Sequence, residues 1–151
     1  MLHSWGFNGQ QPTQNDFSYW ARLKIQDLRY TQDTCNEVFG KSVPHLLTPE
    51  DRDINKLRLK LGDDPDEVLN ALRIYPEVVL HGQKYFSVNN WRTYCVRHCD
   101  AHESVRIWVK LYLSPQAYNN AHGANAFADY YTTTCEGQRI TVTRQHYKGT
   151  D

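Results

Sequence analysis

The first regular pattern of apolar positions begins at Phe17. Phe17, Trp20, Ala21 and Leu28 share one helical face, which predicts a helix over residues 16–30. Residues 8–15 are rich in Gln, Asn and Gly, so we expect residues 1–15 to form an extended arm.

Two consecutive short helices are the clearest prediction. Thr48 is a suitable N-cap and Pro49 a suitable first residue for a helix over residues 49–61, which Gly62 ends. The same order repeats from Asp64 and Pro65, which predicts a helix over residues 65–75. The apolar positions of these helices are Ile54, Leu57, Leu61, Val68, Leu69, Leu72 and Tyr75.

Residues 77–103 have two interpretations. Residues 77–81 and 84–88 flank Gly82-Gln83, as in a β-hairpin. We favour a helix over residues 86–102 with an irregular entry, because a second set recurs at steps of three and four residues: Val88, Trp91, Cys95, His98, Cys99 and His102.

The pattern changes to alternation in the last third. Residues 107–113 read as a half-buried strand, residues 119–126 as a loop, and residues 130–135 and 138–147 as a β-hairpin around Glu136-Gly137. We therefore predict one α+β domain over residues 16–147, with several short helices in its first two thirds, a small C-terminal β-hairpin and a frayed end over residues 148–151.

The charged residues of the chain balance, so the protein as a whole has no strong electrostatic field. Lys plus Arg and Asp plus Glu number 17 each, so a nucleic-acid or membrane partner would require a local patch. Arg52, Lys56 and Lys60 recur every fourth residue and predict a basic helical face, either solvated or in contact with acidic lipid head groups or an acidic partner. The many aromatic residues, four Trp and ten Tyr among them, suit either a small core or contact with another protein.

Cys95, Cys99 and His102 are the best metal-ligand candidates, with Cys35 and Cys135 as further thiols. Zinc sites usually contain a tight Cys-x2-Cys pair, and here the spacing is three residues with no clear second pair. We expect free thiols, two of them buried in a helix, over a disulfide or a metal site.

No complete catalytic motif is present. The sequence contains neither a nucleophile elbow, a phosphate-binding loop nor a dinucleotide fingerprint, so we expect no enzymatic activity, no cofactor and no small-molecule substrate. A winged helix-turn-helix with residues 65–75 as recognition helix is an alternative. However, that helix contains Asp66 and Glu67 and one cation, Arg73, so we expect no nucleic-acid partner.

A resemblance to a known family spans residues 54–98. Ile54-Asn55-Lys56-Leu57 precedes an Asp63-Asp64 pair, then an acidic residue before Val68, then Ala71-Leu72-Arg73 and Pro76-Glu77, with Phe86 and His98 further on. This order resembles the small matrix-side, ubiquinone-binding-protein subunit of the mitochondrial cytochrome bc1 complex.

The resemblance implies an accessory, non-catalytic role on the matrix side of the mitochondrial inner membrane. Its implied partners are cytochrome b and the core subunits, with Arg52, Lys56 and Lys60 meeting acidic lipid or protein surface. An accessory subunit of another large assembly is the more general expectation. The N-terminus lacks the pattern of a secretory signal or a cleavable presequence, and no apolar stretch reaches the roughly 20 residues of a spanning helix.

Overall fold

The computed structural model describes residues 2–3, 18–37 and 52–143 of the chain. Their strands form a six-stranded mixed sheet in the order β1-β2-β7-β5-β6-β3 and a two-stranded sheet of β4 and β8. The strands are β1 Leu2–His3, β2 Ser18–Lys24, β3 Leu28–Tyr30, β4 Thr34–Asn36, β5 Glu77–His81, β6 Lys84–Ser87, β7 Arg106–Tyr112 and β8 Thr141–Thr143. The helices are α1 Ile54–Leu61, α2 Pro65–Leu72, α3 Asn90–Arg97, α4 Pro115–His122 and α5 Ala126–Tyr130, with a 3-10 turn, η1, at Ile25–Asp27. The α+β class is confirmed, but strands occur throughout the described chain and not only near its C-terminal end.

The predicted helix over residues 16–30 is wrong for the residues that the structure describes. Residues 18–24 form β2, which runs antiparallel to β7 and places Ala21 opposite Val109 and Leu23 opposite Ile107. These side chains are buried while Arg22 between them is exposed, so burial follows the period of two that a strand imposes. Pairing of β2 with β7 buries the apolar face of each strand. This burial stabilises the strand conformation more than the helical spacing of apolar residues stabilises a helix.

The two consecutive helices are confirmed with shorter bounds. Helix α1 begins at Ile54, because the carboxylate of Asp53 caps it by accepting the N–H groups of Asn55 and Lys56. The predicted cap at Thr48 and Pro49 lies outside the described residues. Helix α2 begins at Pro65 as predicted and ends at Leu72, because Arg73 takes a left-handed conformation and donates its N–H to the last-turn carbonyls. The predicted stripe of α1, Ile54, Leu57 and Leu61, is fully buried.

Residues 77–97 contain both of the structures that the sequence left open. Strands β5 and β6 form an antiparallel hairpin in which His81 pairs with Lys84. Gly82 and Gln83 both have positive φ, as a two-residue hairpin turn requires. The favoured helix over residues 86–102 is therefore wrong at its start, and only Asn90–Arg97 is helical, as α3.

The predicted C-terminal β-hairpin is also wrong. Residues 115–122 and 126–130, in a region expected to be loop and strand, are the helices α4 and α5, the first capped by Ser114. The turn at Glu136-Gly137 exists, but the described residues on its two sides do not pair with each other, since β8 pairs in parallel with β4. The loop before β8 instead bonds to residues 30–33, through Tyr30 N–H to the Gly137 carbonyl and Thr132 N–H to the Thr31 carbonyl.

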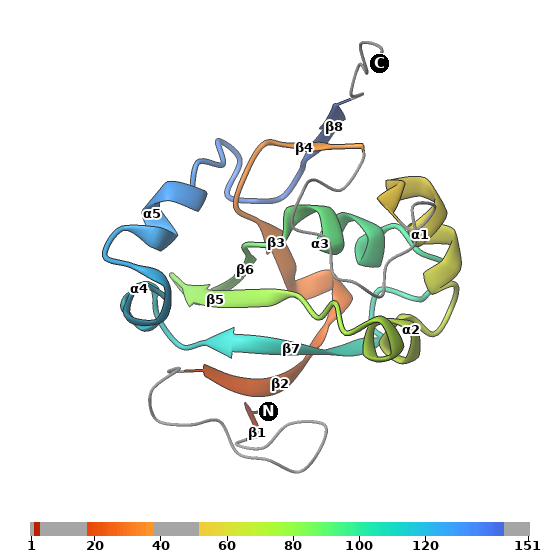
Figure 1. Ribbon diagram of the computed structural model, residues 1–151, viewed down its shortest axis with the longest axis horizontal. Coiled ribbons are helices and arrows are strands. Elements are labelled where there is room, and N and C mark those ends of the chain that lie inside the picture. Colours follow the sequence, from red (N-terminus) through yellow and green to blue (C-terminus); the bar gives the residue numbers. More distant parts are fainter. Residues whose placement is uncertain (1, 4–17, 38–51, 144–151) are drawn as a thin grey trace.

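Two apolar clusters lie on opposite faces of the large sheet. Adjacent residues of a strand point to opposite faces, and Val78 belongs to the larger cluster while Val79 belongs to the smaller one. The larger cluster packs α1, α2 and α3 against the sheet, and the smaller one seats Tyr118 of α4 and Phe127 of α5. Along the strands, α1 and α2 lie at one end of the sheet and α4 and α5 at the other (Figure 1).

Candidate functional site

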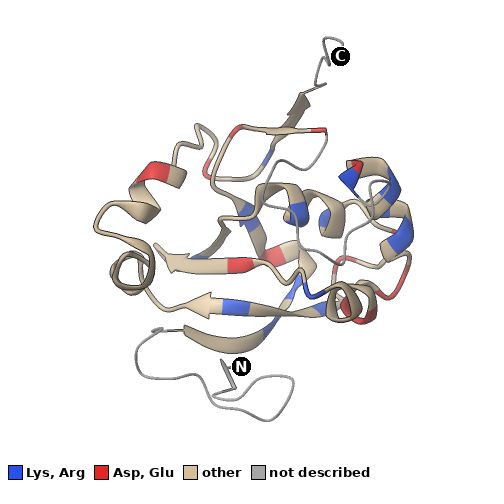
Figure 2. Cartoon of the chain, in the orientation of Figure 1, with Lys and Arg blue, Asp and Glu red and all other residues tan. Residues whose placement is uncertain are grey.

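Two of the three residues of the predicted basic face lie on α1, and the third, Arg52, precedes the N-cap of that helix. Lys56 and Lys60 are exposed on α1, the helix on which Figure 2 shows several cationic positions. Arg52 precedes Asp53 and is half-buried, and its Nε atom is buried without a hydrogen-bond partner in the described part of the chain. The structure therefore keeps two of the three predicted cations on one outward helical face.

Leu59 lies between these two lysines and is the most exposed large apolar side chain among the described residues. Its side chain is 61% exposed, compared with 40% for Leu113 and 39% for Tyr130. Helix α1 thus buries one apolar stripe and presents a further leucine to solvent from its basic side. We call Lys56, Leu59 and Lys60 the α1 surface.

The metal-ligand candidates are not assembled into a site. Cys95 is buried in α3 and donates to the Ile54 carbonyl, while Cys99 donates to the Val96 carbonyl. His102 is exposed, and its Nδ1 atom lies 2.7 Å from the Ser104 hydroxyl. Across the described ranges no three His, Cys, Asp or Glu side chains are placed to hold a metal ion.

All four cysteines are free thiols, and their electrostatic environments differ. Burial raises the pKa of Cys35 to about 11 and also raises the pKa values of Cys95 and Cys99. The pKa of Cys135 is lowered, first by the backbone N–H of Arg139 and then by the Thr133 hydroxyl, which both lie against its sulfur. Only Cys135 therefore has the environment of a reactive thiol.

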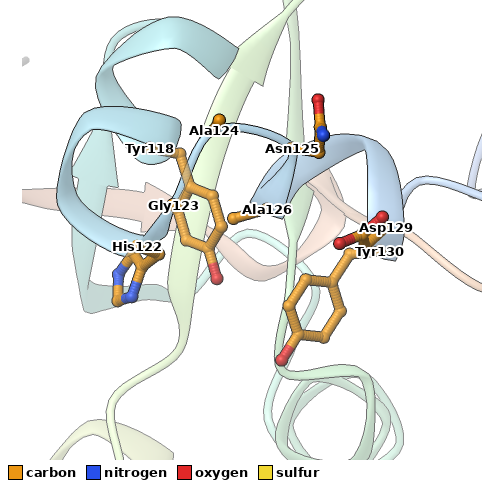
Figure 3. Close-up of a pocket in the computed structure, with 8 residues that line it drawn as sticks. All are labelled: Tyr118, His122, Gly123, Ala124, Asn125, Ala126, Asp129 and Tyr130. Atoms are coloured by element: carbon orange, nitrogen blue, oxygen red, sulfur yellow. The ribbon is translucent and has the colours of Figure 1, made fainter.

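A cleft between α4 and α5 is a feature that the sequence did not indicate (Figure 3). Its volume is about 490 Å³, and it is lined by Tyr118, His122, Gly123, Ala124, Asn125, Ala126, Asp129 and Tyr130. The imidazole of His122 stacks on the Tyr118 ring with 4.4 Å between centroids. Five of the lining residues, 122–126, lie in the stretch 119–126 that the sequence pattern assigned to a loop, so no sequence signal marked the cleft.

The imidazole of His122, in the lining of the cleft, contacts polar groups of the sheet. His122 Nε2 lies 3.0 Å from the Tyr112 hydroxyl and 3.5 Å from the Glu77 carboxylate, which fixes the ring against the sheet. Burial followed by the Glu77 charge raises the pKa of Tyr118, so this phenol stays protonated at neutral pH. The lining of this cleft contains no Ser or Cys side chain beside His122.

These features define an α+β domain with an outward basic and apolar helix surface at one end and a shallow aromatic cleft at the other. No protein-family model matches the chain, and neither a curated protein nor a solved structure matches it significantly. None of the helices in the described ranges combines the length and apolar content needed to cross a bilayer.

Proposed function

We propose that this chain is a non-catalytic accessory subunit that docks onto an acidic face of a partner protein through the α1 surface. The observation that carries the proposal is Leu59, exposed between Lys56 and Lys60 on a helix whose other side is fully buried. An apolar side chain framed by cations matches an interface with an apolar centre and a charged rim.

The energetic roles of the three side chains differ. Burying a leucine that is left in water contributes about 1.5–3 kcal/mol, so Leu59 supplies affinity. Exposed lysines contribute little affinity, but they steer a partner of opposite charge and disfavour partners of like charge. The partner is therefore expected to present an apolar depression bordered by Asp or Glu.

The specific assembly that we propose is the respiratory cytochrome bc1 complex, on its matrix side. The support is the resemblance over residues 54–98, which begins with Ile54-Asn55-Lys56-Leu57 and so includes the first turn of α1. In this role the chain would stabilise cytochrome b and the core subunits while other chains transfer electrons.

The test is native electrophoresis of detergent-extracted membranes from cells that express the tagged full chain. We expect the wild-type protein to migrate with a large complex that contains cytochrome b and cytochrome c1. The double reversal Lys56→Glu/Lys60→Glu should lose this association, because it places like charges across the interface. The control reversal Arg73→Glu/Arg106→Glu, at exposed positions outside α1, should retain it.

The outcomes separate the general proposal from the named complex. Association with a different large complex, lost in the α1 reversal and kept in the control, supports the accessory role and rejects the bc1 assignment. Migration of the wild-type protein alone, or equal loss in both double variants, contradicts docking through the α1 surface.

A further inference from the structure

A second cavity gathers cationic side chains away from both the α1 surface and the α4–α5 cleft. It lies where β3, the end of α3 and the loop before β8 meet, and its volume is about 230 Å³. Its lining residues are Tyr30, Arg97, His98, Gln138, Arg139 and Ile140, and none of them is acidic. Their combination of two guanidinium groups, an imidazole and an amide is a set of hydrogen-bond donors suited to an anion.

Arg97 is held in place before any ligand arrives. Its Nη1 atom donates to the Leu28 carbonyl at 2.9 Å, and its guanidinium carbon lies 5.4 Å from the centroid of the Tyr30 ring. The Tyr30 side chain is itself buried, so this wall of the cavity is rigid. A guanidinium fixed by one of its five donors keeps the remaining donors in a fork that can bind an oxyanion with little further ordering.

Arg139 supplies a second guanidinium to the cavity. Among the described residues its guanidinium forms no ion pair. Asp33 is close enough for Arg139 to contribute to the lowering of its pKa, but the Asp33 carboxylate already accepts hydrogen bonds from the backbone and hydroxyl of Thr134. Arg139 therefore lies near one carboxylate without forming an ion pair with it, and its side chain lines the cavity.

Two cationic side chains lie near His98 at the end of α3. Burial lowers the pKa of His98, and the charges of Arg97 and Arg58 lower it further. Arg58 also donates to the His98 carbonyl at 3.3 Å, which occupies a helix-terminal carbonyl that would otherwise repel an anion. Arg97 and Arg139 line the cavity, and Arg58 of α1 contacts the backbone of His98 beside it.

We propose that this cavity binds a phosphomonoester group, with Arg97 and Arg139 as its principal ligands. Two guanidinium groups on separate elements fit a tetrahedral dianion with three acceptor oxygens better than a planar carboxylate. The cavity is smaller than the roughly 300–1,000 Å³ of pockets for drug-sized ligands, so it suits the phosphorylated end of a ligand. This site is independent of docking through α1.

The test is calorimetric titration of the full chain with inorganic phosphate and with glycerol 3-phosphate at constant ionic strength. At a pH of about 7.5 glycerol 3-phosphate is almost entirely dianionic, since the second pKa of a phosphomonoester is about 6. Inorganic phosphate has a higher second pKa, and the dianion is still its larger fraction at this pH. We expect binding by the wild-type protein and a loss of about tenfold or more in Arg139→Gln, because a hydrogen bond to a charged group contributes at least one power of ten. Arg106→Gln removes the same charge from an exposed position on β7 and should change affinity less than about twofold.

Circular dichroism and urea unfolding of Arg139→Gln show whether the exposed substitution leaves the fold intact. The proposal would be overturned if the wild-type protein bound neither ligand in solution and was not retained on vesicles that contain phosphatidic acid. Equal losses of binding in Arg139→Gln and Arg106→Gln would also overturn it. Tighter binding of the ester than of inorganic phosphate assigns the site to esters, and the reverse assigns it to the free ion. Retention on phosphatidylcholine vesicles that contain phosphatidic acid, lost in Arg139→Gln, would assign the phosphomonoester to a lipid head group.

Discussion

At the scale of single residues, the thiols show how local contacts separate chemically identical groups. Cys95 is buried in α3, where desolvation penalises the thiolate, and Cys35 experiences the same effect. Cys135 lies in the loop before β8, where the Arg139 N–H and the Thr133 hydroxyl stabilise negative charge on sulfur. The sequence could not rank the reactivity of the four cysteines, because the groups that set each pKa come from the folded loop geometry.

We predict that Cys135 is alkylated first when the folded protein is treated with iodoacetamide near neutral pH. Its lowered pKa keeps a larger thiolate fraction at a given pH, so its rate should rise with pH through a lower midpoint than that of the same cysteine in the unfolded chain. The raised pKa values of Cys35 and Cys95 shift their midpoints in the opposite direction. Peptide mass spectrometry over a pH series measures all four rates at once.

The control is the same series in denaturant, where the four cysteines should react at similar rates. Faster labelling of Cys35 or Cys95 than of Cys135 in the folded protein would contradict the electrostatic interpretation.

At the scale of elements, sequence pattern succeeded where a helix or strand has its own signal. Helices α1 and α2 each bury apolar positions against the sheet, and both were predicted, α2 with its first residue Pro65. Strand β2 was missed, because its aromatic residues also fit a helical spacing and only its pairing with β7 decides the conformation. The C-terminal hairpin was wrong for a related reason, since β8 pairs with β4, more than 100 residues earlier in the chain.

The loop before β8 closes the sheet at its β3 edge. Tyr30 N–H donates to the Gly137 carbonyl, and the N–H groups of Thr132 and Thr133 both donate to the Thr31 carbonyl. These bonds occupy edge groups that would otherwise be open to another strand. Gly137 makes this approach feasible, because it has φ of +72° and lies directly against the Tyr30 backbone.

We predict that Gly137→Ala destabilises the protein by about 3 kcal/mol or more, measured by urea unfolding. An added Cβ atom would lie 2.2 Å from the Tyr30 carbonyl oxygen, so the loop must move away from β3, in addition to the cost of positive φ. Gly82→Ala is the matched control, because its φ of +57° is similar and no atom lies within 4 Å of its Cβ position. The control should cost only about 1–2 kcal/mol. Equal losses in the two variants would show that the contact with β3 adds nothing.

At the scale of the whole molecule, the candidate sites are distributed around the sheet. Helix α1 lies at one end of the sheet and helices α4 and α5 at the other (Figure 1). The α4–α5 cleft is therefore far from the α1 surface, and the cavity proposed for an anion is lined by residues of β3, the end of α3 and the loop before β8. Lys56 and Lys60 could be grouped from sequence because they lie four residues apart on one helix. Arg97 and Arg139 could not, because they are 42 residues apart and only the loop before β8 brings them to one cavity.

The central claim is that the chain acts by docking through the α1 surface, and Leu59→Ser tests it most directly. Leu59 is 61% exposed, so its replacement should change the free energy of unfolding by less than about 0.5 kcal/mol. The control is Leu113→Ser, at an apolar side chain that is 40% exposed and follows β7. Both variants and the wild-type protein would be recovered by their tags from detergent extracts, and the partner protein quantified by mass spectrometry.

We predict that Leu59→Ser loses about tenfold of the recovered partner, as removal of a buried leucine from an interface would produce, while Leu113→Ser recovers the wild-type amount. Wild-type recovery of the same partner by a folded Leu59→Ser variant would contradict docking through α1.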